Sequence, residues 1–193
     1  MEKMESVAGM SEQFSETNLL AECKNGNRDA FESLYLQHQK RVFSVALNFF
    51  GGDDSLAKDI TQQVFLKIFA KVSDFRGDSE FTTWLYRMTV NACIDEQRKR
   101  SRFFSIENFF GEFRVKRTPD DKFQQKQISD EVQKAVAKLK AEYRLPILLK
   151  YVEGLSYQEI ADVLECSIGT ISSRLNRGHK LLAGKLAHLK NEV

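Results

Sequence analysis

The stretch Ser156–Ile171, with the sequence SYQEIADVLECSIGTI, decides the fold of the second half of this chain. Ser156 and Glu159 match a capping box, in which each side chain satisfies a free backbone N–H group at the start of a helix. Ser167 can cap a second helix after a short turn. Ala161 is small, which suits a close crossing of the two helices. Their shared core would be formed by the apolar residues Ile160, Leu164, Ile168 and Ile171. The stretch therefore predicts a helix-turn-helix.

The turn of this motif carries Glu165 at a position where helix-turn-helix proteins often have glycine. Glycine adopts a positive φ without steric penalty, whereas a residue with a Cβ atom loses about 1 kcal/mol there. Glu165 therefore predicts either a strained turn or a turn of different geometry.

The second helix of the motif has an outward face of short polar groups and arginines. Basic residues occur throughout the segment 167–191, which contains no acid. A basic helix suits contact with phosphates, and short polar groups suit the major groove of DNA. The alternative is a helical hairpin with a solvated basic face. The candidate DNA contacts are Ser167, Gly169, Thr170, Ser172, Ser173, Arg174, Arg177 and Lys180.

Upstream of the motif, apolar residues at helical spacing predict further helices. A short and a longer helix between Asn18 and Phe50 are separated by a turn at Gly26-Asn27. Breaks follow at 51–54, and a third helix, with Phe69 among the residues on its inner side, ends near Val72. After a polar loop at 73–79, another helix runs from about Phe81 to Lys99.

The segment 101–127 predicts a linker. It holds six of the fifteen phenylalanines, mixed with charges, Gly111 and Pro119, and it shows no sustained helical period. We therefore expect an all-α protein of two small helical domains joined by a flexible linker, with the helix-turn-helix in the C-terminal domain. The expected divisions are an acidic, disordered tail at 1–17, a domain at 18–100, the linker at 101–127 and a domain at 128–193.

Composition limits the class of protein. The 193 residues are 42% hydrophobic and 29% charged, with a net charge of +2, which is ordinary for a soluble globular chain. No apolar run approaches the roughly 20 residues that a bilayer-spanning helix needs, and no targeting segment is recognisable. We therefore expect a cytoplasmic protein without membrane insertion. Cys23, Cys93 and Cys166 lie far apart, which predicts reduced packing residues and no metal site.

The helix predicted from Phe81 has two distinct faces. Arg87, Asn91, Asp95 and Arg98 recur at intervals of four, four and three residues, so they share one side of the helix. The opposite side is apolar, as a core face should be. A polar face of this kind could be ordinary surface, but the helix also ends in a basic cluster suited to backbone phosphates. Its members are Arg98, Lys99, Arg100 and Arg102.

Three stretches resemble the extracytoplasmic-function (ECF) sigma factors of the sigma-70 type. They are DITQQVF at 59–65, FTTWLYRM at 81–88 with its continuation to residue 100, and TISSRL at 170–175. The resemblance runs from about Asn18 to Leu189. Two departures are Gln63, where the family usually has an acid, and Gly178-His179, which stand where Ala-Arg is usual.

The resemblance implies a role for each stretch. The first would dock on the clamp helices of the largest subunit of core RNA polymerase through Asp59, Gln62, Gln63 and Phe65. The third would read the minus-35 element. The second, in sigma region 2, would read the minus-10 element, and the loop before it would capture a flipped base. Phe75 in this loop could stack on that base. A tryptophan at a position like Trp84 is more often a core residue. The implied minus-10 contacts are Phe75, Arg76, Gly77, Ser79, Trp84, Arg87, Asn91, Asp95, Arg98 and Arg100.

A sigma factor would have core RNA polymerase, including its flap region, and promoter DNA as partners, with an anti-sigma factor as a further possibility. It would need no cofactor and catalyse no reaction itself. The alternative is an autonomous helix-turn-helix regulator, which would bind DNA without polymerase. An enzyme finds little support, because His38, His179 and His188 are scattered and no phosphate loop or nucleophile motif is present.

Overall fold

The computed structural model describes residues 16–107 and 131–188, with side chains left out of the description at 103–107. All regular elements in these two ranges are helical, as the sequence predicts. The acidic tail, apart from its last two residues, and most of the expected linker at 101–127 lie outside the described residues. None of the described helices combines the length and the apolarity needed to cross a membrane.

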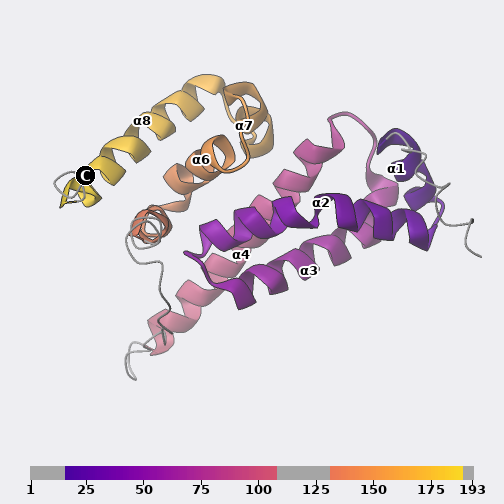
Figure 1. The fold of residues 1–193 in the computed structure, drawn as a ribbon, viewed down its shortest axis with the longest axis horizontal. Helices are drawn as coiled ribbons and strands as arrows, with labels where there is room; N and C mark the ends of the chain where they lie inside the picture. Colours follow the sequence, from indigo (N-terminus) through magenta and orange to yellow (C-terminus); the bar gives the residue numbers. More distant parts are fainter. Residues whose placement is uncertain (1–15, 108–130, 189–193) are drawn as a thin grey trace, which may run out of the picture.

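The N-terminal module, residues 16–107, is a group of helices packed around a shared apolar core (Figure 1). The longer helices α2, α3 and α4 contact one another, and α1 covers one end of α2. The elements are α1 (Glu16–Lys24), α2 (Arg28–Phe49), α3 (Asp54–Lys71), the short 3-10 helix η1 (Val72–Asp74) and α4 (Phe81–Glu107).

Local sequence signals set where α2 and α3 begin. The Asn27 side chain accepts hydrogen bonds from the backbone N–H groups of Asp29 and Ala30, at 3.0 and 3.3 Å. At α3, Asp53 caps in the same way by accepting from the N–H group of Leu56 at 3.0 Å. These caps satisfy donors that a helix start leaves free, and the predicted break at Gly26-Asn27 is confirmed.

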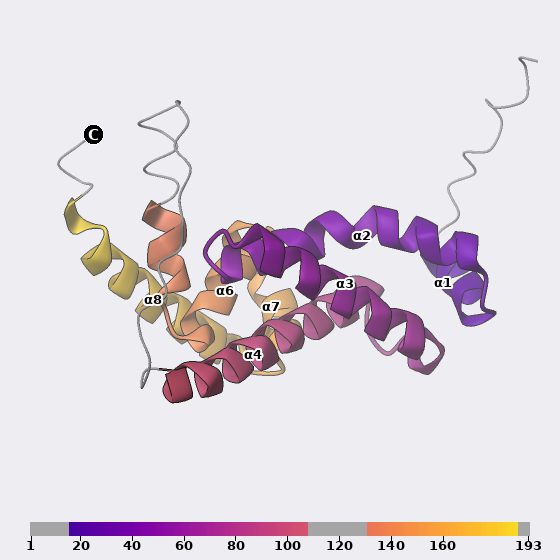
Figure 2. The same cartoon turned by 90° about the horizontal axis from the view of Figure 1, so that it is seen from below.

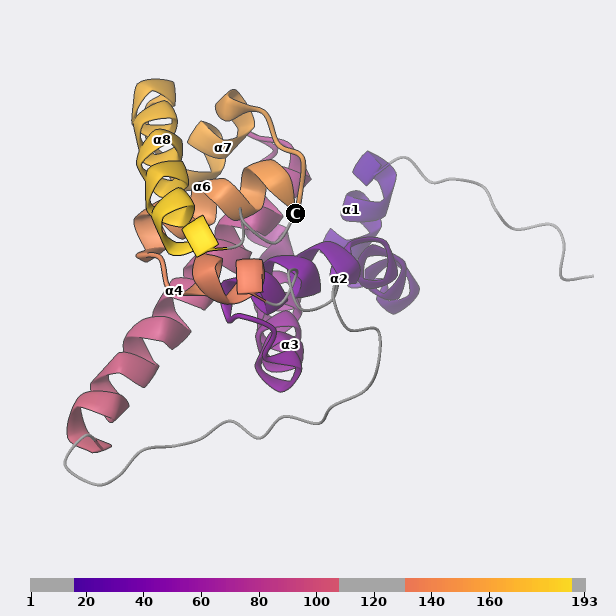
Figure 3. The ribbon, with the colours of Figure 1, turned by 60° about the vertical axis from the view of Figure 1, so that its left-hand side comes forward.

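Helix α4 is longer than the sequence predicts. We expected it to end near Lys99, but it continues to Glu107 and therefore includes the first residues of the expected linker. No glycine or proline occurs between Phe81 and Gly111, so each added residue gains a hydrogen bond at little cost once the helix has formed. The last turns of α4 extend away from the other helices (Figure 3).

The C-terminal module, residues 131–188, begins with a helical stretch at 131–137. Three helices follow: α6 (Ala141–Tyr151), α7 (Tyr157–Leu164) and α8 (Ile168–Lys185). Helix α6 packs on α8, and α8 packs on α7. This module lies at the end of the molecule opposite α1, next to α4 and the end of α2 (Figures 1 and 2).

The two modules are docked against each other, which the sequence did not predict. The guanidinium group of Arg144 is buried, donates from Nη1 to the carbonyl oxygen of Phe49 at 2.8 Å, and lies 4.4 Å from the centroid of the Phe49 ring. At the turn after α2, a Cβ atom on Gly51 would lie 3.0 Å from Cβ of Ala137. One cluster of buried apolar residues therefore runs through both modules.

Candidate functional site

The predicted helix-turn-helix is formed by α7 and α8. The Ser156 hydroxyl accepts from the N–H group of Glu159 at 3.2 Å, and the N–H group of Ser156 donates to Oε2 of Glu159 at 2.7 Å. Hydrogen bonding of the Glu159 carboxylate to the side chain and to the backbone N–H group of Ser156 holds its pKa below its usual range. The Ser167 hydroxyl accepts from the N–H group of Thr170 at 3.2 Å at the start of α8. The predicted capping box and second cap are confirmed.

The turn between α7 and α8 has the left-handed geometry that glycine favours, although Glu165 occupies it. Its φ and ψ are 51° and 47°. Its backbone N–H group bonds the carbonyl of Ala161, as a residue ending a helix in this conformation commonly does. The Cβ atom of Glu165 is expected to cost about 1 kcal/mol at this φ, so the strained alternative of the two predicted turns is the observed one.

Most of the predicted contacts on α8 are open to solvent. Arg174 is half-buried, with Nη1 3.9 Å from the sulfur of Cys166. Thr170 is also half-buried and shares a 2.9 Å hydrogen bond with the hydroxyl of Ser167. The remaining members are exposed: Ser167, Gly169, Ser172, Ser173, Arg177 and Lys180.

The glycine that departs from the family's usual residue on α8 has a packing role. A Cβ atom on Gly178 would lie 2.6 Å from Cδ1 of Ile147 on α6. Real Cβ atoms essentially never come so close, so a side chain at position 178 would force the Ile147 side chain to shift, and glycine leaves room for it between α6 and α8. Sequence reasoning connected Gly178 only with contacts to DNA and missed this role, because the partner lies 31 residues upstream.

On α4, the predicted reading face (Arg87, Asn91, Asp95 and Arg98) is partly covered by the C-terminal module. Arg87 is half-buried and donates from Nε and Nη2 to the carbonyl oxygen of Asp162, at 3.0 and 2.8 Å. Its Nη1 lies 3.6 Å from Oε1 of Glu165. Asn91, Asp95 and Arg98 are exposed.

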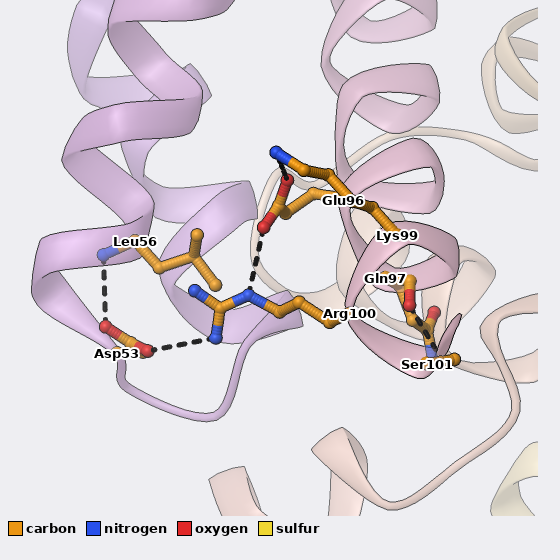
Figure 4. A network of polar contacts seen from close by, with 7 residues as sticks. All are labelled: Asp53, Leu56, Glu96, Gln97, Lys99, Arg100 and Ser101. Atoms are coloured by element: carbon orange, nitrogen blue, oxygen red, sulfur yellow. Dashed lines mark hydrogen bonds and ion pairs between the residues drawn. The ribbon is translucent and has the colours of Figure 1, made fainter. Parts of the chain in front are cut away.

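Arg100, also predicted to contact DNA, takes part in a polar network at the end of the N-terminal module (Figure 4). Its Nε lies 3.0 Å from Oε1 of Glu96, and its Nη1 lies 3.8 Å from Oδ2 of Asp53, the residue that caps α3. The guanidinium also lies 6.0 Å from the centroid of the Phe50 ring. Arg100 therefore connects α4 to the start of α3.

The loop before α4 borders a cavity of about 560 Å³ between α1 and residues 75–81. Arg76 and Gly77 are exposed there, and Ser79 is half-buried. Phe75 is only 9% exposed, with its ring centroid 5.3 Å from that of the half-buried Trp84. We expected that the Phe75 ring could stack on a base. In the structure the ring is instead packed into the module, where neighbouring aromatic rings cover it.

An apolar groove of about 680 Å³ lies between α2 and α3. Of the predicted polymerase contacts, Gln62 and the buried Phe65 line it, whereas Asp59 and Gln63 are exposed beside it. Leu66 and Phe69 also line it and are 63% and 53% exposed. The prediction that Phe69 faces inward is therefore wrong. Its side chain points into the groove, and its ring centroid lies 4.9 Å from that of Phe31.

A cleft of about 770 Å³ lies between α4 and the C-terminal module. It brings together residues predicted to contact different parts of DNA: Arg87, Asn91 and Arg98 from α4, and Arg174 from α8.

The thiols of the described residues show no disulfide, and the sulfur of Cys166 lies 3.9 Å from Nη1 of Arg174. Cys23 and Cys93 are buried and Cys166 is half-buried, all as free cysteines. Burial raises the pKa of Cys93 to about 12, so it stays protonated at neutral pH. Within 16–107 and 131–188, no cluster of three or more His, Cys, Asp or Glu residues could hold a metal ion.

Comparison with known proteins agrees with this geometry. The family model for sigma-70 region 2 matches residues 34–103, and the model for sigma-70 region 4 matches residues 129–182. The ECF RNA polymerase sigma-E factor of Escherichia coli K12 is 30% identical over 190 residues, which is 93% of this chain and 98% of the relative. The chain belongs to the ECF sigma factors of RNA polymerase. It is therefore a sigma factor that acts with RNA polymerase on promoters in transcription initiation.

Other relatives of this sigma factor agree with the assignment. The RNA polymerase sigma-H factor of Pseudomonas aeruginosa is 30% identical over 194 residues, covering 95% of this chain and all of the relative. Among solved structures, CnrH in complex with the cytosolic domain of CnrY aligns with a TM-score of 0.67 at 25% identity, covering 88% of this chain and 96% of that one. The sigma factor RpoE of Bartonella quintana, in complex with the anti-sigma factor NepR, aligns with a TM-score of 0.67 at 26% identity, covering 81% and 96%.

Proposed function

We propose that α8 is the minus-35 reader of this sigma factor. The cap at Ser167 fixes the start of α8, and the exposed residues on its first turns form a polar, acid-free surface that fits the major groove. Arg174 is the proposed base-reading residue, since arginine can donate two hydrogen bonds to one guanine. Arg177 and Lys180 are the proposed phosphate contacts.

We also propose that α4 and the loop before it bind the melted minus-10 strand. The cavity between α1 and residues 75–81 can accept an unstacked base. Asn91, Asp95 and Arg98 are exposed on α4 and are the proposed contacts to the rest of the strand. Energy gained in these contacts offsets the few kcal/mol needed to unstack each flipped base. Bond formation stays with the polymerase, so the chain itself is not an enzyme.

The groove between α2 and α3 is the proposed docking site for core RNA polymerase. Its open apolar residues, Leu66 and Phe69, suit the apolar side of a helical hairpin such as the clamp helices of the largest subunit. Gln62 offers an amide at the groove wall. The flap region of the polymerase is the proposed partner of the C-terminal module. Because both proposed contacts are with RNA polymerase, the proposed location of the chain is the cytoplasm.

We propose the domain division 18–100, 101–127 and 128–193 for the region 2 domain, the linker and the region 4 domain. The ranges matched by the two family models support it. An anti-sigma factor is a further proposed partner, because the RpoE relative of known structure is in complex with one.

One chain of this family combines a capped helix-turn-helix with an open apolar groove between α2 and α3, and this combination supports the proposal. The test is transcription from a promoter of its own organism with purified core polymerase, with and without the chain. Transcripts that require the chain support the proposal. An autonomous regulator would shift duplex DNA alone and start no transcripts on a template without another initiation factor.

At the level of residues, Arg174→Ala is expected to weaken promoter binding by about 1–3 kcal/mol and to relax sequence preference at one position. Lys185→Ala, in the last turn of the same helix, is the matched control. Equal effects of the two substitutions, with unchanged preference, would reduce Arg174 to a phosphate contact.

A further inference from the structure

A cavity of about 320 Å³ lies within the C-terminal module, at the C-terminal end of α8. Its walls are the helical stretch 131–137 and the last turns of α8, which lie side by side (Figures 1 and 2). The buried Ala135 and the half-buried Leu186 form its apolar part. At about 30 Å³ for each water molecule, the cavity has room for about ten waters or for one compact polar group.

The lining of this cavity is mainly basic. The backbone N–H group of Lys138 donates to the carbonyl oxygen of Lys134 at 3.1 Å, so these two lysines are one helical turn apart on one wall. Lys185 comes from the other wall. Within residues 16–107 and 131–188, the ammonium groups of these three lysines have no ion pair and no hydrogen bond. The cavity therefore gathers three positive charges that the described part of the chain does not pair.

The acid that lines the cavity is engaged elsewhere. Oε2 of Glu131 lies 3.0 Å from Nε2 of His188, and this contact joins the two walls at one edge. Lys185 lies in the last turn of α8, where a positive charge is favourable for the helix itself. Lys134 and Lys138 have no such role, so their convergence on the cavity indicates a negatively charged group from outside the chain.

The residue types indicate which anion fits. The ammonium group of lysine is a compact charge that suits phosphate, whereas the planar fork of arginine is the better match for a carboxylate. Three such charges on two facing walls can contact two linked phosphate groups. Among the described residues that line the cavity, no Phe, Tyr or Trp offers a ring on which a base could stack. The cavity therefore suits a diphosphate group and leaves the rest of its carrier in solvent.

Promoter DNA fits this cavity less well than a small molecule does. Recognition helices contact base edges with their N-terminal residues. Helix α8 has 18 residues, so Lys185 lies about 27 Å from the start of the helix at about 1.5 Å per residue. The major groove is only about 12 Å wide. A duplex read by the first turns of α8 thus leaves the last turn outside the groove.

We propose that Lys134, Lys138 and Lys185 bind the diphosphate group of a small molecule. The site is separate from the proposed DNA contacts of α8. It is formed within the C-terminal module, so it stands independently of the proposed promoter contacts. The ligand contacts both the stretch 131–137 and α8, so it stabilises their packing.

Inorganic pyrophosphate is the probe, and its binding to the full chain is measured by isothermal titration calorimetry at low ionic strength, where charges are least screened. Lys134→Gln and Lys138→Gln are each expected to lower the association constant about tenfold, as loss of a hydrogen bond to a charged group does. Lys140→Gln is the matched control, because it removes the same charge from an exposed lysine that does not line the cavity. It should bind as the wild type does. Equal losses in all three variants, or no binding by the wild type, would overturn the proposal.

Urea unfolding separates loss of binding from loss of structure. Without pyrophosphate, Lys134→Gln and Lys138→Gln should unfold as the wild type does, because neither ammonium group has a partner to lose. Added pyrophosphate should raise the unfolding midpoints of the wild type and of Lys140→Gln, and raise those of the two cavity variants less, since a ligand stabilises the fold in proportion to its binding. Equal shifts in all four proteins would place pyrophosphate elsewhere and overturn the proposal.

A DNA measurement distinguishes a small-molecule site from a contact to the DNA backbone. For a promoter duplex, Lys138→Gln is expected to leave the slope of log K against log salt at the wild-type value. A lysine that contacts a DNA phosphate would instead reduce this slope by about 1 when it is replaced. That reduction would overturn the small-molecule assignment and give the lysines to promoter DNA.

Discussion

The two helices assigned to promoter DNA present their side chains in different ways. On α8, Arg177 and Lys180 are exposed and have no ion pair in the described part of the chain. On α4, Arg87 is held by the C-terminal module and Arg100 by the acids of its own module. The basic groups Arg177 and Lys180 of the proposed duplex-reading helix are thus free of ion pairs, whereas Arg87 and Arg100 of the proposed strand-reading helix are engaged within the described part of the protein.

The largest expected effect tests whether the duplex reader depends on its close helix crossing. Gly178→Ala places a methyl group 2.6 Å from Cδ1 of Ile147 and should lower the free energy of unfolding by about 1–3 kcal/mol. Gly184→Ala is the matched control: nothing lies within 4 Å of its Cβ position, and alanine should stabilise the helix by up to about 1 kcal/mol. Both are measured by urea unfolding. Equal stabilities would mean that α6 and α8 are not locked together.

The second prediction contrasts Arg177 with Arg100. Arg177→Ala should reduce the slope of log K for promoter DNA against log salt by about 1 and leave stability within about 0.5 kcal/mol of wild type. Arg100→Ala should instead lower the free energy of unfolding by less than about 1 kcal/mol, because its ion pairs are partly exposed. A larger salt effect at Arg100 than at Arg177 would remove the contrast between the helices.

The third prediction concerns pH and the N-terminal module alone. Burial is the largest cause that lowers the pKa of His38 below 6.5, although Glu16 lies 3.1 Å from its Nε2 and opposes the shift. As the pH falls through 6.5, His38 becomes protonated in the unfolded chain but stays neutral in the folded chain, so the free energy of unfolding decreases. His38→Gln should flatten this part of the curve of unfolding free energy against pH. A profile that keeps its slope would assign the effect to other groups.

The smallest net effect is expected where the two modules meet, at Glu165. Glu165→Gly relieves about 1 kcal/mol of left-handed strain and removes an exposed ion pair with Arg87 worth less than about 1 kcal/mol. The two changes nearly cancel in the free energy of unfolding. Glu165→Ala loses the ion pair and keeps the strain, so it should be about 1 kcal/mol less stable than the glycine variant. Equal stability of the two variants would mean that the turn is unstrained.

Local signals in the sequence were enough to predict much of the reader. The capping box at Ser156 and Glu159 and the cap at Ser167 lie within three residues of their partners, so a short pattern contains the whole interaction. The spacing of Arg87, Asn91 and Arg98 likewise predicted a shared face of α4, since helical geometry is periodic.

Features that depend on distant partners could not be predicted in this way. Arg87 and Asp162 are 75 residues apart, and nothing near either residue shows that they meet. Phe69 belongs to the apolar pattern of α3, but it lines an open groove and is 53% exposed, and periodicity alone does not distinguish a groove-lining residue from a core residue. The predicted end of α4 near Lys99 is too early. The aromatic and charged residues that follow are typical of a linker, but they can also continue a helix, and α4 runs to Glu107.

The contact between Gly178 and Ile147 also has a mechanical consequence. The absence of a side chain at Gly178 leaves room for Ile147, so α8 can pack closely on α6, and both helices also contact α7, which makes the three one packed unit. In its proposed role, this unit would meet each promoter with an unaltered outline.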